Sequence, residues 1–489
     1  DNDVIYGVQW IFNKAVALNK PCVVNLSLGG QLGPHDGSSP YEEALSNMVK
    51  PGRIIVAAAG NAGADYIHAS FAASGTSYND APEVLWEMPQ GTTFSGVDMW
   101  YPAANTMSVG IGVYGVSQGQ LQYLANTAPV PAGQKIQNQQ VVYQGNVLGT
   151  VTVDASSPAS NNSRNVLFIV QGNNIPQFYW TVYAFGNGTL DAWVVTGGRF
   201  SPPITGLPQL IKFGDNDKSV GTPSTAKKIV CVGAYVSKNS WVDSNGTTQA
   251  QPSICGGNPP QVAELSCFSS HGPTRDGRTK PDFTAPGEAI VSALSSGYTN
   301  APAAHVLQGG GLQKQQGTSQ ASPHVTGIVA LMLQRNKFLT YENVVSLLSS
   351  TATAAGTVNL WGAGKVRALN AMLATPAGID CQTQAKLTGI DCDGNRVLRY
   401  QLLNAYPNPF NPATTIGFRI GTQEKVDLAI YDILGRRIRM ITNDILPEGL
   451  HNVVWDGVDD QGRQVSSGVY YTRLVTPSFS SSSKLLMVK

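Results

Sequence analysis

The period of the hydrophobic pattern changes along this chain, and this constrains the fold more than any other feature. Residues 1–62 alternate helical and strand patterns, with helices expected at 4–18 and 41–48 and strands at 22–28 and 54–59. Both strand segments are largely apolar. Apolar strands that alternate with helices are typical of a parallel sheet covered on both faces. The first part of the chain is therefore predicted to be an α/β structure.

A strand pattern without helical stretches interrupts this arrangement from about residue 65 to 213. The expected strands include residues 106–114, 141–143, 147–153, 178–185 and 189–196. Gly-Asn at 145–146 is expected to turn the second of these into the third, and Gly-Asn-Gly at 186–188 to join the last two as a hairpin. An all-β sandwich is therefore predicted as an insertion.

The α/β pattern resumes at about residue 214. The elements expected there are a strand at 229–235 and helices at 319–334, 341–349 and 365–373. The first of these helices has an almost wholly apolar body, so we expect it to be buried. Its Pro323 falls near the first turn, where proline is tolerated.

Short alternating strands return after residue 402, beyond a polar stretch at 376–401. Strands at this spacing, separated by turn signals, indicate a small Ig-like sandwich. The predicted organisation is an α/β domain in two parts, 1–64 and 214–375, with the β insertion 65–213 between them, then the linker 376–401 and the all-β domain 402–489.

The charge of the chain excludes several classes of partner. Lys and Arg number 32 and Asp and Glu 31, which gives a formal net charge of +1. Binding to nucleic acid needs an excess of positive charge, so no nucleic-acid partner is expected. No apolar run approaches the ~18 residues that a membrane-spanning helix requires, so no membrane span is expected either.

Six cysteines indicate an oxidising compartment, because two pairs lie close together in loops. The expected disulfides are Cys255–Cys267 and Cys381–Cys392. Cys22 and Cys231 lie in apolar strand-like runs and are expected to be free thiols. No cluster of metal-ligating residues stands out, so no metal ligand is named and a structural calcium ion has no assigned place.

The strongest catalytic signal is the segment Gly-Thr-Ser-Gln-Ala-Ser-Pro-His-Val at residues 317–325. It delivers Ser319 to the N-terminus of the predicted buried helix. Free N–H groups and positive potential at that end would stabilise an oxyanion formed at this serine. Taken alone, the pattern favours a serine that only caps its helix.

Three further segments favour the catalytic interpretation. Residues 25–30 end the first strand in a pair of glycines, residues 56–63 end the second in a Gly-Asn turn, and residues 270–287 form a loop that leads into Ala-Pro-Gly. Together with the segment around Ser319, they resemble the subtilisin-like serine proteases (subtilases), in that family's order. The resemblance covers both parts of the α/β domain and implies a subtilisin-like parallel-sheet fold.

The resemblance implies a catalytic role for two residues. Ser319 matches the nucleophile. Asn61 matches the side-chain donor of the oxyanion hole, which acts beside the Ser319 backbone N–H. Gln320 stands where many family members carry Met, and a glutamine cannot form a sulfoxide.

The resemblance also implies a substrate-binding site. Ser27, Leu28 and Gly29 match the strand that pairs with the substrate backbone and walls the first specificity pocket. Gly221 matches the floor of that pocket, which would leave room for a large P1 side chain. The Thr-Pro pair at 222–223 is a candidate cis peptide.

The chain departs from the family in one major respect, since the motifs that carry the catalytic Asp and His are absent. The histidines are His35, His68, His271, His305, His324 and His451. His324 matches a structural histidine of the family, and His35 is expected to order its loop. Without a histidine, Ser319 has no general base. We therefore expect these 489 residues alone to be nearly inactive, with the Asp and His on an N-terminal piece.

The C-terminal region carries a second resemblance. Its motifs lie at residues 406–412, 430–436, 455–457, 467–471 and 484–489. They resemble the C-terminal sorting domain of type IX secretion, which is related to Ig-like modules of flagellar hook caps. This implies export from a bacterium of the Bacteroidetes–Chlorobi kind, to the medium or the cell surface. The β insertion resembles, more weakly, the jelly-roll insertion of subtilases of spore germination.

Two functions are compatible with these patterns. The first is a secreted serine endopeptidase that hydrolyses proteins or peptides through an acyl-enzyme, with its own N-terminal fragment as a partner. The second is a processed or inactive protease-like scaffold in an extracellular or cell-surface assembly, held together by self-association of the β domains through free strand edges. No cofactor is identified for either function.

Overall fold

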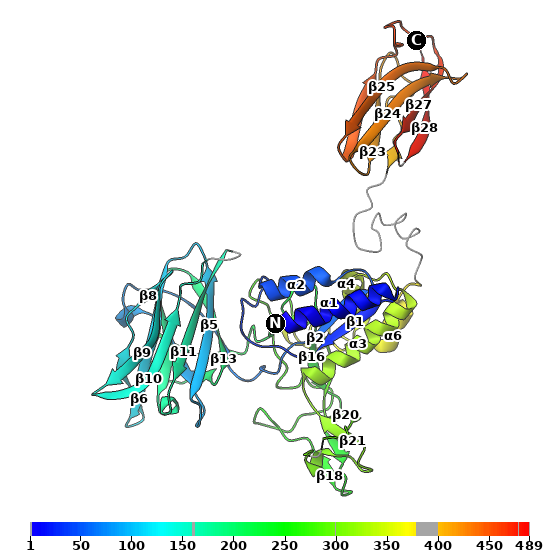
Figure 1. The fold of residues 1–489 in the computed structure, drawn as a ribbon. Helices are drawn as coiled ribbons and strands as arrows, with labels where there is room; N and C mark the ends of the chain where they lie inside the picture. Colours follow the sequence, from blue (N-terminus) through cyan, green and yellow to red (C-terminus); the bar gives the residue numbers. More distant parts are fainter. Residues whose placement is uncertain (1, 159–161, 299, 378–399, 478, 489) are drawn as a thin grey trace. The chain divides into compact units, whose positions relative to one another are not determined.

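The chain forms two compact units, Asp1–Gly378 and Ile379–Lys489. The structure is a computed structural model, shown as a ribbon in Figure 1. It describes residues 2–158, 162–298, 300–377, 400–477 and 479–488. Most of the predicted linker 376–401, and with it the predicted disulfide Cys381–Cys392, lies outside the described residues.

A four-stranded parallel sheet forms the centre of the first unit. In spatial order its strands are β1 (Cys22–Leu26), β2 (Arg53–Ala58), β16 (Val230–Val236) and β19 (Phe283–Glu288). Strands β2 and β16 are buried along nearly their whole length. Burial on both faces explains why their sequences are continuous apolar runs, and the predicted parallel sheet is confirmed.

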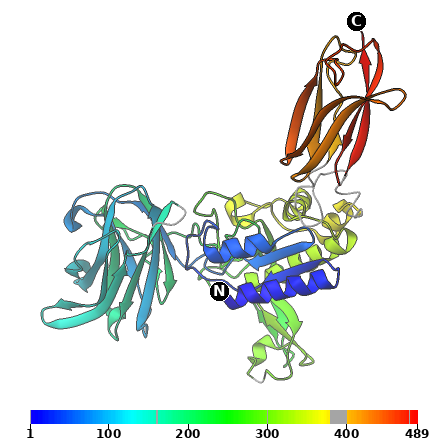
Figure 2. The same ribbon diagram turned by 45° about the horizontal axis from the view of Figure 1, so that its top comes forward.

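Helices surround this sheet (Figures 1 and 2). They are α1 (Asn2–Ala17), α2 (Pro40–Met48), α3 (Thr318–Arg335), α4 (Tyr341–Thr351), α5 (Val358–Trp361) and α6 (Ala368–Ala374). Helix α3 packs against all four strands and so occupies the centre of the core. None of the helices in the described residues is both long and apolar enough to cross a membrane.

Most of the apolar body of α3 is buried, but the expectation that all of it is buried is wrong at one residue. Val325, Val329 and Met332 are fully buried, whereas Leu331 is 47% exposed. The reason is the helical period, which points residues on one side toward the sheet and turns Leu331 away from it.

The α/β part also carries two small antiparallel ribbons, which extend beyond the sheet in Figure 1. One is made of β17 (Ser240–Val242) and β18 (Thr248–Ala250), the other of β20 (Ile290–Ala293) and β21 (Leu312–Gln315). A single 3₁₀ turn, η3 (Ala303–His305), lies between β20 and β21 in the chain. The second ribbon leads directly into the start of α3.

Two further sheets, built from the residues between β2 and β16, share one hydrophobic core. The six-stranded sheet contains, in spatial order, β3 (His68–Ala72), β13 (Thr189–Thr196), β5 (Phe94–Pro102), β11 (Ser163–Gln171), β10 (Asn146–Asp154) and β9 (Lys135–Tyr143). The other contains β14 (Arg199–Phe200), β4 (Glu83–Glu87), β12 (Tyr179–Gly186), β6 (Met107–Ser117) and β7 (Gln120–Asn126), with β8 (Val130–Pro131) and β15 (Ile211–Lys212) at its side. Two 3₁₀ turns, η1 (Tyr78–Asp80) and η2 (Ile175–Gln177), complete this part.

The predicted hairpin at residues 186–188 is wrong. Strand β12 pairs with β4 and β6, whereas β13 pairs with β3 and β5 in the opposite sheet. The Gly-Asn-Gly loop therefore crosses from one sheet to the other. Its glycines allow a sharp turn either within a hairpin or between sheets, so they do not indicate which strands pair.

The predicted turn at 145–146 is shifted by one residue. Asn146 already pairs with Tyr143, so the loop between β9 and β10 is Gln144-Gly145. Both loop residues have positive φ, at 49° and 81°. Such a pair of angles matches the right-handed twist of the flanking strands in a two-residue hairpin.

The second unit contains two antiparallel sheets around its own apolar core. One is made of β22 (Gln401–Leu402), β23 (Thr414–Ile420) and β26 (Gly449–Trp455), the other of β25 (Arg437–Leu446), β24 (Glu424–Asp432), β27 (Gly468–Val475) and β28 (Ser480–Met487). The core side chains alternate along β23 and β24, as expected for two sheets that each turn one face inward.

A buried histidine joins the β insertion to the α/β sheet domain. His68 Nδ1 lies 2.6 Å from Asp215 Oδ1, and its Nε2 lies 3.2 Å from Asp191 Oδ1. Burial disfavours charge on His68, but the hydrogen bonds to the two carboxylates outweigh it and raise the pKa of His68. Lys218 Nζ donates to the same Asp191 at 2.5 Å, and the pKa of Asp191 is lowered to about 2: burial opposes this shift, and the bonds to His68 and Lys218 outweigh it.

We predict that His68 stabilises the fold at acid pH and loses this effect at alkaline pH. Its folded pKa is raised, so its contribution is complete below the unfolded pKa and is lost as the pH rises through the folded value. The free energy of unfolding of the wild type minus that of His68→Gln should therefore fall as the pH rises from about 6.5, the ordinary pKa of histidine, through the raised folded value. Urea unfolding across this range measures it, and a difference that grows with pH contradicts the assignment.

We also predict that two neighbouring residues of α3 differ sharply in their effect on stability. Met332→Ala should cost about 2–5 kcal/mol, because it opens a cavity against the sheet. Leu331→Ala serves as the matched control and should cost under about 1 kcal/mol, since half of that side chain is already in water. Equal shifts of the urea midpoint for the two variants would contradict this placement of α3.

Candidate active site

Ser319 is the second residue of α3 and is half-buried. The helix is preceded by Gly317, whose φ of 142° favours glycine and whose N–H donates to Gly287 O at 2.8 Å. A Cβ at Gly317 would meet the end of the Gln320 side chain, 2.8 Å from its Oε1, but that end can move, so the positive φ is what requires glycine here. Among the described residues none accepts a hydrogen bond from the Ser319 N–H. This donor is therefore available at the positive end of the helix.

Asn61 follows β2 and is exposed at the same helix end. Its Oδ1 accepts from the Thr318 N–H at 2.9 Å and from Thr318 Oγ1 at 2.9 Å. Since a backbone N–H can only donate, it requires the amide oxygen of Asn61 on its side. The Thr318 Oγ1 in turn accepts from the Gly60 N–H at 3.1 Å. The amide group of Asn61 is thus oriented with its oxygen against the helix and its NH₂ group free to donate.

Pro323 lies beyond the first turn of α3, which corrects its predicted place. Because proline has no N–H, the carbonyl of Ser319, four residues earlier, loses its usual helical partner. Ser27 replaces that partner: its Oγ donates to Ser319 O at 2.8 Å and also lies 3.0 Å from Ser322 Oγ. In return Ser319 Oγ donates to Ser27 O at 3.3 Å. The residue after β1 thus fixes the backbone of the candidate nucleophile.

The two segments expected to form the specificity pocket touch each other. The Gly30 N–H donates to Thr222 O at 3.0 Å, and the Thr222 N–H donates to Gly30 O at 2.9 Å. A Cβ at Gly29 would lie 2.6 Å from Thr222 O, and one at Gly221 would lie 2.7 Å from Gly30 O. Both glycines are therefore required for this close backbone approach. Leu28 is 45% exposed beside them.

The peptide bond between Thr222 and Pro223 is cis, as predicted.

Ser319 opens into a hollow of about 400 Å³. The hollow is lined by Ile290, Val291, Ser292, Gln313, Gln315, Ser319, Gln320, Pro323 and His324. One wall is the ribbon of β20 and β21 and the other is the first turns of α3. An extended chain bound there would lie against Ser319.

No histidine of this chain is placed to act as the base. All six are described, and none is hydrogen-bonded to Ser319. His324 lines the hollow, but its Nδ1 lies 2.9 Å from Gln320 O of its own helix. His35 is fully buried between two carbonyl oxygens, in agreement with the predicted loop-ordering role. The site therefore brings together the predicted nucleophile and the predicted oxyanion donors, and none of the described histidines is hydrogen-bonded to Ser319.

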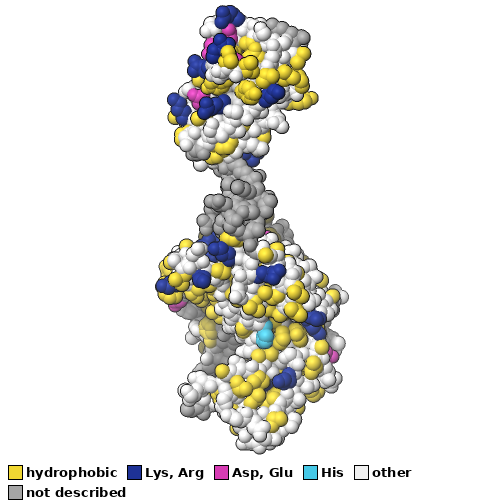
Figure 3. Space-filling model, turned by 90° about the vertical axis from the view of Figure 1, so that its right-hand side faces the viewer, with side chains coloured by type: hydrophobic (Ala, Val, Ile, Leu, Met, Phe, Trp, Pro, Cys, Tyr) yellow, Lys and Arg dark blue, Asp and Glu magenta, His cyan; other side chains and the backbone are white. Residues whose placement is uncertain are grey.

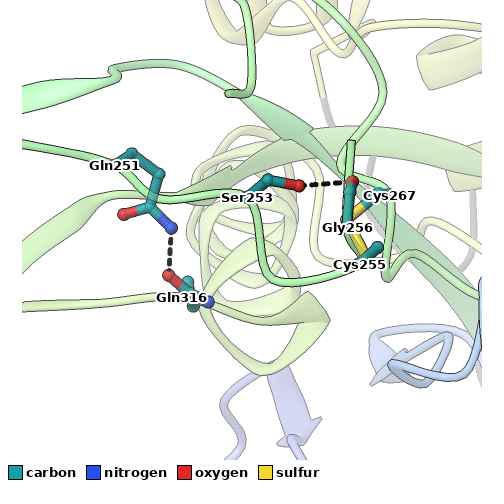
Figure 4. Close-up of a disulfide and its surroundings, with 6 residues drawn as sticks. All are labelled: Gln251, Ser253, Cys255, Gly256, Cys267 and Gln316. Carbon is teal, nitrogen blue, oxygen red and sulfur yellow. Dashed lines mark hydrogen bonds between the residues drawn. A yellow bond between two sulfur atoms is a disulfide. The ribbon is translucent and has the colours of Figure 1, made fainter. Parts of the chain in front are cut away.

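One predicted disulfide forms in the loop that follows Gln251. Cys255 and Cys267 are bonded, the pairing expected from their spacing. Figure 4 shows Gln251, just before this disulfide loop, donating to the side chain of Gln316. Gln316 precedes Gly317, so Gln251 contacts the segment that leads into α3. Cys22 and Cys231 are free.

The described residues offer no candidate site for the structural calcium ion. In the part of the chain that is described, no group of three or more His, Cys, Asp or Glu side chains could hold a metal ion.

Sequence reasoning missed two residues that shape this site. Thr318 holds Asn61 in place. Its position between the helix-capping glycine and Ser319 is the signal that could have identified it. Trp193 packs its ring against His35 from the β insertion, with ring centroids 4.2 Å apart. No local signal identifies Trp193, because it is distant in sequence from every motif of the site.

Family models match most of the chain. The model of the subtilase family matches residues 1–173 and 168–364, and that of the FlgD Ig-like domain matches residues 410–478. The first match covers well over half of the sequence. The chain belongs to the subtilase family. Its C-terminal unit contains an Ig-like domain.

Curated relatives of this subtilase include two proteases of Bacillus subtilis. Serine protease AprX is 32% identical over 167 residues, which is 32% of the chain and 33% of AprX. Minor extracellular protease Vpr is 37% identical over 122 residues, 23% of the chain and 14% of Vpr. The chain thus spans a third or less of the length of these two relatives.

A solved structure shares the fold of the subtilase. The CspB protease of Clostridium perfringens has a TM-score of 0.55 to this chain, at 22% sequence identity, and the match covers 76% of this chain and 71% of that one. At this identity the similarity concerns the fold alone.

We predict that Thr318→Val weakens the joint between β2 and α3. The variant keeps the shape but leaves the Gly60 N–H without its acceptor and removes one donor from Asn61, which should cost about 1–3 kcal/mol. Thr351→Val is the control, since that hydroxyl bonds only carbonyls of its own helix and should cost under about 1 kcal/mol. Urea unfolding measures the free energy of unfolding of both variants. Similar losses of stability would contradict the proposed connection between β2 and α3 through Thr318.

Proposed function

We propose that this subtilase is a serine endopeptidase and that Ser319 is its nucleophile. The observation that carries the proposal is the orientation of Asn61. Two hydrogen bonds from Thr318 hold its oxygen and leave its NH₂ group free to donate. A Cβ built on Gly317 would lie 3.4 Å from Asn61 Nδ2 and 3.6 Å from the Ser319 N, so both donors border the same space. A pair of donors at a helix N-terminus suits the oxyanion of acyl transfer.

The proposed reaction proceeds in two steps. Ser319 Oγ attacks the carbonyl carbon of the scissile peptide while its proton passes to a histidine base. The negative charge that develops on the carbonyl oxygen is stabilised by the Ser319 N–H and the Asn61 NH₂ group. The C–N bond then breaks, the amine leaves with the proton from the histidine, and water hydrolyses the acyl-enzyme to restore Ser319.

We infer that the Asp and His of the triad come from a segment outside these 489 residues. Strand β1 supports this, because in the described residues it pairs only with β2 and its other edge is open. The outer face of α1 also supports it, since Tyr6 and Trp10 are 66% and 68% exposed. A strand with its helix would cover the open edge of β1 and the outer face of α1. The face of the first unit seen in Figure 3 carries hydrophobic side chains mixed with scattered Lys and Arg side chains.

The proposed cellular location rests on the disulfide and on the Ig-like unit. The disulfide Cys255–Cys267 suits an oxidising compartment, and the Ig-like unit suits a C-terminal sorting domain for type IX secretion. We therefore propose a secreted or surface-attached bacterial protease with a jelly-roll-like insertion. Protease protection in intact cells and fractions tests the location; a cytoplasmic protein would contradict it.

The alternative is an inactive extracellular scaffold. The observation that favours it is the lack of a base among the described histidines, together with open strand edges in the β sheets. It predicts oligomers or fibres in light scattering and electron microscopy, with no reactive serine.

We predict that a fluorophosphonate probe labels Ser319 in the complete protein. Ser319→Ala should abolish labelling, and Asn61→Ala should slow peptide hydrolysis by about 100- to 1000-fold, the range for loss of one oxyanion donor. Ser322→Ala, which changes the neighbouring serine of the same helix, should keep labelling. Intact mass and peptide mapping locate the label. A folded, intact sample that reacts at no serine would contradict the protease and favour the scaffold.

A further inference from the structure

The pocket walls of the proposed protease are thin. The segment after β1 and the segment at 220–222 meet through a pair of backbone hydrogen bonds between Gly30 and Thr222, with no side chain between them. Two glycine-rich strands of backbone have little stiffness of their own. Their separation is therefore set by whatever holds them from behind.

A single buried imidazole spans both walls. His35 Nδ1 lies 2.8 Å from Val220 O, and its Nε2 lies 3.0 Å from Gln31 O. Gln31 directly follows Gly30, and Val220 lies two residues before Thr222, so His35 bridges the walls close to where they touch. The side chain is fully buried, and burial lowers the pKa of His35 to about 4. A neutral imidazole can donate a hydrogen bond to only one of the two carbonyls. Packing against neighbouring side chains must therefore also fix the position of the ring.

Trp193 supplies that packing from the β insertion. Its indole stacks on His35 with centroids 4.2 Å apart and an angle of 4° between the rings. Its Nε1 donates to Lys218 O at 2.9 Å, two residues before Val220. Trp193 is fully buried and belongs to β13, so its position is set by the sheet of the insertion.

Two further sets of hydrogen bonds link the insertion to the same loop. Asp98 of β5 accepts a hydrogen bond from the Gly33 N–H at 2.8 Å. Arg275 donates to Pro34 O at 2.8 Å and to Ser163 Oγ at 2.8 Å, and so joins the loop to β11.

From this arrangement we propose that Trp193 and His35 are positioning residues of the P1 pocket, so that the β insertion sets the substrate specificity of the protease. The inference rests on the proposed function, since it assigns the walls at Gly29 and Gly221 to substrate binding. The ligand class is the side chain of the peptide residue that precedes the scissile bond. Neither residue touches the reacting atoms.

The first test measures hydrogen exchange of the Gly30 and Thr222 amides in the 489-residue chain. Trp193→Leu removes the stacked ring, and these two amides should exchange roughly tenfold faster or more. Trp193→Phe keeps an aromatic face and should restore most of the protection. Trp180→Leu is the matched control, because Trp180 is fully buried in the core of the insertion and also donates its Nε1 to a backbone carbonyl. It should speed exchange inside the insertion and leave Gly30 and Thr222 unchanged.

The second test measures kcat/KM of the complete protease on peptides that differ only in the residue before the scissile bond. Trp193→Leu should compress the ratio between the best and worst residue by about tenfold, whereas Trp180→Leu should lower total activity at an unchanged ratio. If Trp193→Leu does not fold, His35→Gln replaces it in both tests and should act in the same direction.

The outcomes separate the two proposals. Unchanged exchange at Gly30 and Thr222 in Trp193→Leu overturns the positioning role. Faster exchange with an unchanged ratio of kcat/KM overturns the link to specificity. A wild type that cleaves no peptide overturns the protease function, and the exchange measurement still decides whether Trp193 holds the walls.

Discussion

The hydrogen bonds from Thr318 to Asn61 are the joint on which the site depends. They connect the end of β2 to the first residue of α3, so the sheet and its central helix meet at the atoms proposed to react. A side-chain oxygen held by two donors cannot rotate freely, and the opposite NH₂ group is therefore oriented before a substrate binds. Preorganisation of this kind is what makes donors effective toward a developing charge.

A second joint connects the β insertion to the same region. Trp193 lies between His35, at 4.2 Å, and His68, at 5.0 Å, and one histidine faces backbone carbonyls while the other faces carboxylates. The carboxylates raise the pKa of His68, and burial lowers that of His35. One aromatic ring thus separates a histidine that favours charge from one that excludes it. The insertion is therefore packed against the walls of the proposed pocket through groups that tolerate little displacement.

Much of the α/β fold was predictable because its signals are local. Continuous apolar runs predict β2 and β16, and the glycine before Ser319 predicts the start of α3. The errors arose where a local pattern fits more than one arrangement. The loop at 186–188 can close a hairpin or cross between sheets, and Leu331 is apolar yet half-exposed. Pro323 was expected near the first turn of α3 but lies beyond it, because the helix begins at Thr318. The helix tolerates this proline because Ser27 donates to the Ser319 carbonyl in place of the missing N–H.

The sequence by itself determined the family and predicted the nucleophile and its oxyanion donor, because each of the four motifs consists of residues that are neighbours in the chain. It also determined one disulfide, whose cysteines share a loop. Only the tertiary structure decided which sheet each insertion strand joins, how Thr318 orients Asn61, and that Trp193 stands behind His35. These are contacts between distant segments. Their free energy comes from packing and shared burial, which no short stretch of sequence records.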